Sequence, residues 1–180
     1  HKDIVLAVSH LSFPPIGERA DGAASIIARY TGNQPKVIEL GSDVEGGRKI
    51  FAGWLERNPI PGAVIAVTNV TTLSVLSALA DHHVDIPSRT SIVAFDDYAW
   101  MAARKTGLTA IRQPADEIVS AVWKRLRYRM EAGNKTPVQP SVFSASLVVR
   151  DSVKSLSVAK AKGLKARDVK PENMLADKDQ

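Results

Sequence analysis

The sequence lacks several features that define whole classes of protein. None of its 180 residues is cysteine, which excludes disulfide bridges and thiolate zinc sites and fits a reducing compartment. No run of about 18 uninterrupted apolar residues occurs, and no basic stretch followed by an apolar core opens the chain. We therefore predict neither a membrane span nor a secretory signal, and expect a cytoplasmic protein without membrane contact.

The chain also carries little net charge. The formal net charge is only +5, and the excess of basic residues is thin and dispersed along the chain. The one dense basic run is Lys124, Arg125, Arg127 and Arg129, whose apolar neighbours at helical spacing indicate a solvated helix face rather than a nucleic-acid patch. We do not expect this chain to bind DNA by itself.

The residues that are present predict one domain of α/β class. With 44% hydrophobic and 24% charged residues, the chain is long enough to bury a core. Short, continuous, β-branched apolar runs are typical of strands buried on both faces of a parallel sheet. Four such runs alternate with helical patterns, which predicts a doubly wound parallel sheet. The predicted strands are 3–9, 36–40, 63–67 and 90–95, and the predicted helices run from about Pro15 to Gly32, 44–58 and 71–82.

The later segments have less regular patterns. Residues 108–113 predict a fifth strand, 114–132 a long amphipathic helix and 142–149 a late strand. The last 30 residues have few regularly spaced apolar positions, so we expect a flexible tail or a marginal helix there.

Polar side chains follow each of the four predicted strands. In an open parallel sheet, ligands bind beyond the carboxyl ends of the strands. Ser42 and Asp43 follow the second strand and Asn69 follows the third, but these three are explained equally well as helix caps. For them, helix capping and ligand contact remain open alternatives.

Asp96 and Asp97 follow the fourth strand directly, where two adjacent carboxylates are costly unless they are paired or hydrated. A carboxylate with an amide such as Asn69 nearby suits vicinal hydroxyls, because the carboxylate only accepts hydrogen bonds and the amide both donates and accepts. An acid/base pair or a magnesium site is the enzymatic alternative. Successive strand residues do not point into one site, and no His, Cys or Lys has a matching placement. We predict ligand binding rather than catalysis, with no metal and no cofactor.

Three segments together resemble the LacI/GalR family of transcription repressors. Val84 to Asp97 (VDIPSRTSIVAFDD) is similar to the family pattern V-P-x-D-[IV]-S-V-V-G-[FY]-D-D, although Ala94 replaces the usual glycine. Leu108 to Pro114 (LTAIRQP) resembles L-T-T-[VI]-R-Q-P, and Leu147 to Ser152 (LVVRDS) resembles L-V-V-R-[ED]-S. The resemblance covers about residues 2 to 152. It implies a periplasmic-binding-protein-like effector domain of two lobes, preceded by a helix-turn-helix head and a hinge helix.

The resemblance also implies how the chain divides. Residues 1–113 would form the carboxyl-terminal lobe, 114–135 a helix of the amino-terminal lobe, 136–152 the closing strand and 153–180 a flexible tail. The head and most of the amino-terminal lobe would lie before His1, so we expect a fragment or a truncated product. Without that lobe, Ile118, Val122, Trp123 and Leu126 would lose their packing, and their helix would fold back, pair between chains or be mobile.

The resemblance implies roles for particular residues. Asp96 matches the aspartate that binds the effector in the family, and Asn69 matches the asparagine of the N-D-x-x-A motif. Arg19 matches the arginine of an R-x-x-G motif, and Gln113 matches the glutamine of the L-T-T-[VI]-R-Q-P segment, where the chain crosses between the lobes. Val70 departs from the usual aspartate after Asn69, and Ser42 and Asp43 stand where relatives often have an aromatic residue, which argues against a stacked flat ring. The implied dimer interface comprises Tyr98, Trp100, Met101, Leu73 and Leu76.

The implied function is that of an allosteric sensor. A small polar effector (a sugar, sugar acid or nucleoside-like molecule) would bias the two lobes, and the heads of a homodimer would follow; operator DNA would be bound only through the helix-turn-helix. A sugar-binding transport or chemosensory protein of the same fold is one alternative. An α/β enzyme that uses Asp96 is another.

Overall fold

Six strands form a single sheet in the computed structural model, which describes residues 1–132 and 140–155. The strands are β1 (Ile4–Val8), β2 (Lys36–Glu39), β3 (Ala63–Ala66), β4 (Ser91–Phe95), β5 (Thr109–Arg112) and β6 (Ser146–Val148). Their spatial order is β2-β1-β3-β4-β5-β6. Strands β1 to β5 are parallel, and β6 runs antiparallel to β5 at the edge. The predicted doubly wound sheet is confirmed, with one antiparallel edge strand.

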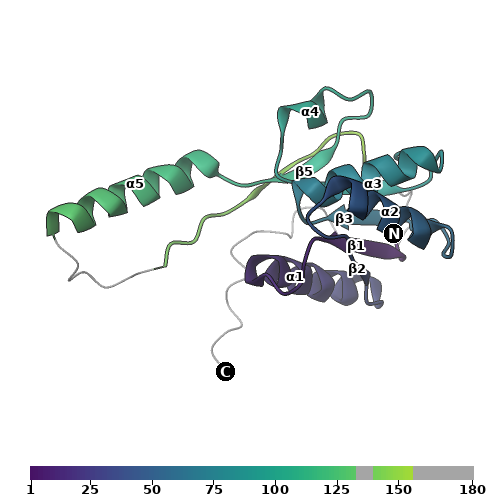
Figure 1. Cartoon of the computed structure of the whole chain (residues 1–180), viewed down its shortest axis with the longest axis horizontal. Helices are drawn as coiled ribbons and strands as arrows, with labels where there is room; N and C mark the ends of the chain where they lie inside the picture. Colours follow the sequence, from purple (N-terminus) through teal and green to yellow (C-terminus); the bar gives the residue numbers. More distant parts are fainter. Residues whose placement is uncertain (133–139, 156–180) are drawn as a thin grey trace, which may run out of the picture.

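Two of the five described helices, the second and third in chain order, cover one face of this sheet and the first covers the other (Figure 1). The helices of the described residues are α1 (Pro14–Thr31), α2 (Val44–Leu55), α3 (Asn69–Asp81), the short α4 (Ala99–Ala102) and α5 (Ala115–Ala132). Helix α1 ends at Gly32, whose φ of 74° and amide bond to the Ala28 carbonyl form a left-handed cap that glycine adopts without steric cost. The sequence predicted the four long helices to within a few residues but did not predict α4.

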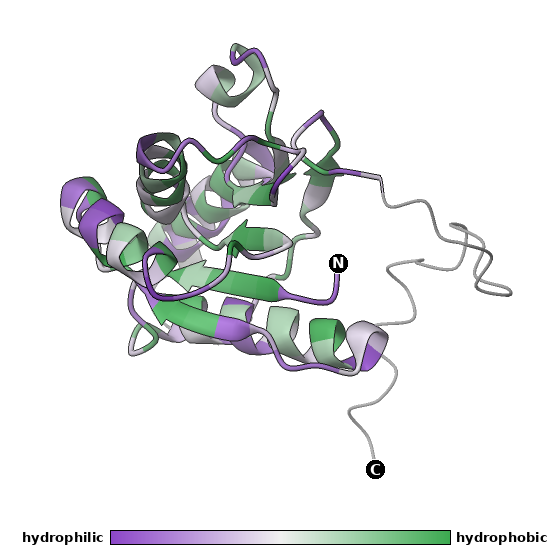
Figure 2. Cartoon of the chain, turned by 90° about the vertical axis from the view of Figure 1, so that its right-hand side faces the viewer, coloured by the Kyte–Doolittle hydropathy of each residue, from purple (hydrophilic) through white to green (hydrophobic). Residues whose placement is uncertain are grey.

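Each face of the sheet has its own apolar cluster. Along β1, Val5 and Ala7 pack in the cluster that includes residues of α2 and α3, whereas Leu6 and Val8 pack in the cluster that includes residues of α1. This alternation follows from the two-residue period of a strand. The strands are mostly apolar and lie between helices that combine apolar and polar residues (Figure 2).

Helices α2 and α3 approach each other closely at Gly47. A Cβ atom at this glycine would lie 2.5 Å from the Ser74 Oγ and 2.9 Å from the Leu40 carbonyl oxygen. The Ser74 hydroxyl donates to the Val44 carbonyl across the same contact, at 3.0 Å. The absence of a side chain at Gly47 therefore sets the distance between the two helices.

The direction of the chain reverses between β1 and β3. From β1 the chain crosses to β2 on one side, and it then returns past β1 to β3, β4 and β5 on the other. In a doubly wound sheet, this switch point opens a crevice at the carboxyl ends of the strands, because the two connections leave in opposite directions. The predicted ligand-binding residues lie on or beyond this edge.

Helix α5 does not return to the sheet. It extends away from β5, and the chain comes back as β6 (Figure 1). Among the described residues, no strand or other helix packs extensively against α5, and Val122 and Trp123 are 61% and 58% exposed. Of the outcomes expected for this helix, folding back onto the sheet is the one that the structure contradicts.

No helix in the described part of the chain combines the length and apolar character that crossing a bilayer requires. Most of the predicted tail, 153–180, lies outside the described residues. Residues 133–139, which span the predicted boundary between the helix segment 114–135 and the closing segment 136–152, also lie outside them.

Candidate functional site

Asp96 lies at the end of β4 in a left-handed backbone conformation, with a φ of 63°. This conformation is uncommon outside glycine but is better tolerated by aspartate than by most residues. The Asp96 amide donates to the Ile111 carbonyl at 2.9 Å, so the turn is anchored to β5. The Gln113 side chain donates from Nε2 to Asp96 Oδ1 at 2.6 Å. The structure thus brings together two residues that the sequence predicted as ligand contacts.

Arg19 reaches the same edge of the sheet from α1. Its Nη1 donates to the Val67 carbonyl just beyond β3, at 3.1 Å. Its guanidinium lies over the Phe95 ring, 4.0 Å from the centroid. Both contacts fix the guanidinium between the ends of β3 and β4, next to the residue that precedes Asp96. Phe95 was not predicted as a site residue, and only its place before Asp96 could have suggested it.

Asn69 is the first residue of α3 rather than its cap. The cap is Thr68, whose hydroxyl accepts from the Thr71 amide at 3.1 Å while the Thr71 side chain accepts from the Thr68 amide. Asn69 is therefore not needed for capping, and its buried Oδ1 has no hydrogen-bond partner among residues 1–132 and 140–155. A buried, unpaired amide oxygen is costly unless something donates to it, so a ligand donor at this position would relieve the cost.

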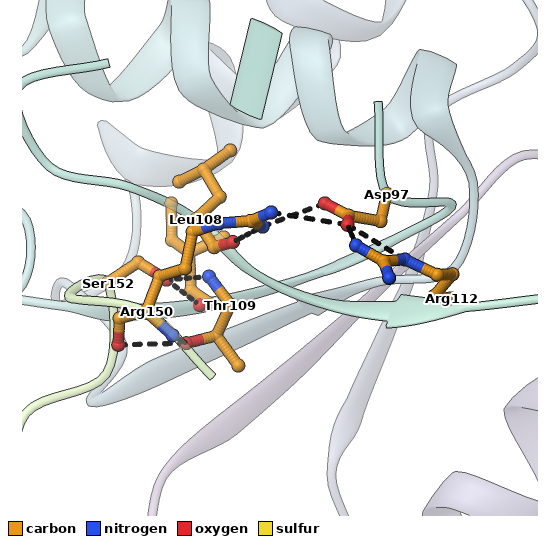
Figure 3. Close-up of polar contacts among 7 residues, drawn as sticks. Asp97, Leu108, Thr109, Arg112, Arg150 and Ser152 are labelled. Atoms are coloured by element: carbon orange, nitrogen blue, oxygen red, sulfur yellow. Dashed lines mark hydrogen bonds and ion pairs between the residues drawn. The ribbon is translucent and has the colours of Figure 1, made fainter. Parts of the chain in front are cut away.

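Asp97 has a different role from Asp96. Its side chain is only 3% exposed and forms ion pairs with Arg150 and Arg112 (Figure 3). Arg150 Nη1 donates to Asp97 Oδ1 at 2.7 Å, and Arg112 Nε donates to Oδ2 at 3.0 Å. The hydrogen bond from Arg150, reinforced by Arg112, holds the pKa of the Asp97 carboxyl below its ordinary value, although burial acts in the opposite direction. Two arginines therefore neutralise Asp97, which leaves Asp96 as the carboxylate beside the crevice.

The two arginines come from the two segments that connect the sheet to α5. Arg112 is the last residue of β5, and Arg150 follows β6. Arg150 Nη1 also donates to the Leu108 carbonyl at 2.6 Å. Both arginines lie in the sequence motifs, but the sequence analysis did not predict their role. The requirement that two adjacent carboxylates be paired or hydrated could have indicated that Asp97 needs a cationic partner.

A hydroxyl secures the returning segment to the sheet. The fully buried Ser152 donates from Oγ to the Ile92 carbonyl at 2.7 Å and accepts from the Thr109 amide at 2.8 Å. Because these two groups belong to β4 and β5, Ser152 links the returning chain to both strands (Figure 3). We call Asp97, Arg112 and Arg150 the Asp97 cluster. Its Arg112 is held by β5, and its Arg150 is held through Ser152, which lies two residues further along the chain.

Ser42 and Asp43 lie at the carboxyl end of β2. Asp43 caps α2, with its Oδ2 accepting from the Gly46 amide at 2.6 Å, and Ser42 is exposed. Capping therefore accounts for Asp43, while ligand contact by either residue stays a prediction.

A hollow of about 280 Å³ lies beside Asp96 and Gln113, lined also by Tyr98 and Arg112.

The predicted dimer residues divide into two groups. Met101 and Leu76 are buried in the core, at 0% and 7% exposure, which corrects the expectation that their side chains face a partner. Both side chains belong to the apolar cluster that also contains Leu108, whose amide donates to the Met101 carbonyl at 3.0 Å. Tyr98 is 48% exposed, and Leu73 and Trp100 are half-buried. Any contact with a second copy on this face would involve these three residues.

Known proteins share both the sequence pattern and the fold. The profile of the periplasmic binding protein-like domain matches residues 1–153. The HTH-type transcriptional regulator AscG of Escherichia coli is 26% identical over 159 residues, which cover 85% of this chain and 46% of AscG. The chain spans less than half the length of such curated relatives.

Solved structures agree. A LacI family transcriptional regulator from Enterococcus faecium with bound ribose superposes with a TM-score of 0.75 at 22% identity, covering 87% of this chain and 58% of that one. The lac repressor dimer bound to operator and the anti-inducer ONPF superposes with a TM-score of 0.73 at 20% identity, covering 86% and 54%. The chain therefore belongs to the periplasmic binding protein-like domain family, in the form found in LacI-type transcriptional regulators.

Proposed function

We propose that this chain is the effector-sensing region of a LacI/GalR-type regulator and binds a small polar ligand at the carboxyl edge of the sheet. The observation that carries the proposal is the convergence of Arg19, Asn69 and Asp96 on the ends of β3 and β4, beside the switch point of the sheet. Ligands of open α/β sheets bind at such points.

The chemistry of these groups favours a ligand rich in hydroxyl groups. Arg19 offers further N–H donors beyond the one directed at Val67. Asp96 Oδ1 is held by Gln113, and its carboxylate retains capacity to accept hydrogen bonds from hydroxyl groups. Asn69 Oδ1 supplies an additional acceptor. A sugar, a sugar acid or the ribose of a nucleoside offers both donors and acceptors to these groups, and the relative from Enterococcus faecium carries ribose.

The proposed consequence of binding is allosteric. Residues 1–113 would act as one lobe, and the segments around Arg112 and Arg150 would connect it to a second lobe. Effector binding would bias the relative orientation of the lobes and, in a cytoplasmic homodimer, the affinity of helix-turn-helix heads for operator DNA. The name of AscG as an HTH-type regulator favours this proposal over a transport or chemosensory protein of the same fold.

We also propose that the chain is not an enzyme. The second carboxylate of the Asp96-Asp97 pair is neutralised by two arginines, so it is a poor general acid or base at neutral pH. The curated relatives are regulators.

Isothermal titration calorimetry tests the site. D-ribose, D-gluconate and adenosine represent the three ligand classes, and the variants are Asp96→Ala and Asp3→Asn. Asp3 is an exposed carboxylate at the opposite end of the sheet, so its neutralisation controls for net charge. We expect one class to bind the chain and Asp96→Ala to weaken that binding about tenfold to hundredfold, because a charged hydrogen bond contributes about 1.5–3 kcal/mol.

Binding that is equally strong in Asp96→Ala would contradict the assignment of the site. A ligand that is consumed during the titration, with turnover lost in Asp96→Asn at unchanged folding, would instead favour the enzymatic alternative.

A further inference from the structure

The two adjacent carboxylates after β4 have different electrostatic surroundings. Asp97 is only 3% exposed and is paired with Arg112 and Arg150. Asp96 forms no ion pair with any of the described residues, and its side chain is held by the neutral amide of Gln113, which donates from Nε2 to Oδ1 at 2.6 Å. The chain therefore pairs one carboxylate with two arginines and leaves the other without a cationic partner.

Arg19 reaches this edge of the sheet from α1 but is not paired with Asp96. Its Nη1 donates to the Val67 carbonyl at 3.1 Å, and its guanidinium lies 4.0 Å from the centroid of the Phe95 ring. A ligand that covers Asp96 and excludes water would therefore bury a carboxylate that has no ion-pair partner within the described part of the chain. Burying an unpaired charge is costly, so a ligand that brings a positive charge gains over one that does not.

Asn69 adds a second hydrogen-bond acceptor at this edge. Strands β3 and β4 are hydrogen-bonded neighbours, with Ile65 opposite Val93, so the residues just beyond the two strands lie side by side. The buried Oδ1 of Asn69 has no partner in residues 1–132 and 140–155. Two vicinal hydroxyl groups could donate to Asp96 and Asn69, but they would leave the charge of Asp96 in place. A protonated amine donates up to three hydrogen bonds and also neutralises that charge.

Two helix N-termini at this edge are unsuited to an anionic ligand, although helix N-termini commonly bind anions. Helix α1 begins with Pro14 and Pro15, which have no N–H, and the next two amides donate to the Phe13 carbonyl. Helix α2 is capped by the carboxylate of Asp43 and has Glu45 in its first turn. One helix thus offers no free amide in its first turn, and the other offers negative charge, which favours a cationic group on the ligand.

We propose that the effector places a protonated amine between Asp96 and Asn69 and is therefore an amino sugar or a related amino-substituted polyol, bound more tightly than the plain sugar. This inference rests on the proposed effector role and deepens it by naming the class of ligand. Asp96 supplies the countercharge, Gln113 fixes the orientation of its carboxylate, and Asn69 Oδ1 accepts a second N–H. The hydroxyl groups of the same ligand face the remaining N–H donors of Arg19.

Three matched ligands test the proposal by isothermal titration calorimetry on the whole chain, at about pH 6.5, where the amine is protonated. D-glucosamine carries the ammonium group, D-glucose has a hydroxyl at the same position, and N-acetyl-D-glucosamine has a neutral amide there. We expect D-glucosamine to bind at least about tenfold more tightly than the other two, because only its amine neutralises Asp96. At about pH 9 the amine is deprotonated, and the preference should disappear.

Asp96→Asn is the decisive variant, because it removes the charge and keeps the shape of the side chain. It should reduce the affinity for D-glucosamine about tenfold, to that for D-glucose. Asn69→Ala removes the second acceptor and should weaken D-glucosamine about threefold to tenfold. The matched control is Asp3→Asn, an exposed carboxylate at the opposite end of the sheet, which should leave all three affinities unchanged. Circular dichroism checks that each variant remains folded.

Three results would overturn the inference. The first is binding of D-glucose or N-acetyl-D-glucosamine that is as tight as that of D-glucosamine. The second is a preference for the amine that is retained in Asp96→Asn. The third is the absence of saturable D-glucosamine binding up to about 20 mM.

The same titrations separate this inference from the proposed function. Binding of D-ribose or D-gluconate that depends on Asp96, without any preference for the amine, would overturn the amine and leave the effector role standing. A chain that binds none of the sugars, acids, nucleosides and amines would contradict both.

Discussion

Removing the guanidinium of Arg150 tests the physical account of the Asp97 cluster. Arg150→Met keeps much of the aliphatic stem but removes the bonds to Asp97, at 2.7 and 3.2 Å, and to the Leu108 carbonyl, at 2.6 Å. Asp97, only 3% exposed, would retain Arg112, whose side chain is 55% exposed. The change therefore leaves a buried carboxylate with one solvent-screened partner and a carbonyl without its donor.

The magnitude follows from burial. Breaking a buried ion pair costs about 3–5 kcal/mol when the remaining charge has no other partner. The remaining partner Arg112 offsets part of this cost, and the lost carbonyl bond adds about 1 kcal/mol. We expect Arg150→Met to lower the free energy of unfolding by about 3 kcal/mol. The matched variant Arg112→Met removes an exposed partner and should cost about 1 kcal/mol or less.

Urea unfolding at pH 7, followed by circular dichroism, measures both values. A double-mutant cycle with Asp97→Asn isolates the coupling between Asp97 and each arginine. The reasoning is refuted if Arg112→Met is as destabilising as Arg150→Met, or if Arg150 shows no coupling to Asp97.

Three other changes have defined outcomes. Ser152→Ala should lower the unfolding free energy by about 2–4 kcal/mol in urea titrations, since it removes bonds to both β4 and β5; a loss below 1 kcal/mol would contradict this. The depressed pKa of Asp97 means that its pairing stabilises the fold fully above about pH 4 and is lost as pH falls through the lower folded value. Wild-type thermal stability should thus fall more steeply in acid than that of Asp97→Asn, and parallel curves would refute the assignment. Gly47→Ala should destabilise by about 1–3 kcal/mol through overpacking, whereas Gly53→Ala, with its nearest atom at 3.7 Å, should stabilise by about 0.5–1 kcal/mol.

Continuous apolar runs made the parallel strands predictable, because a strand buried on both faces leaves little room for polar residues. The direction of β6 was not predictable in this way, since Ser146 and Leu147 are exposed and the pairing with β5 depends on tertiary contacts. Helix α4 has four residues, too few to show a period.

The candidate site was predictable in its residues but not in its connections. Strand ends identified Asn69 and Asp96, whereas the family resemblance supplied Arg19 and Gln113. Neither source indicated that Arg19 lies over Phe95 or that Thr68 caps α3, because these contacts join segments far apart in the sequence or depend on local backbone geometry.

The pairing of β5 with β6 has a topological consequence. Arg112 and Ser146 are direct partners across the two strands, so everything from Gln113 to Ala145 is an insertion that leaves and re-enters the fold at a single hairpin stem. A two-residue turn such as Asn-Gly could close this stem and keep the register of the sheet. Because no other described helix or strand packs extensively against α5, evolution could lengthen or exchange the insertion beyond Gln113 while the described core stayed the same.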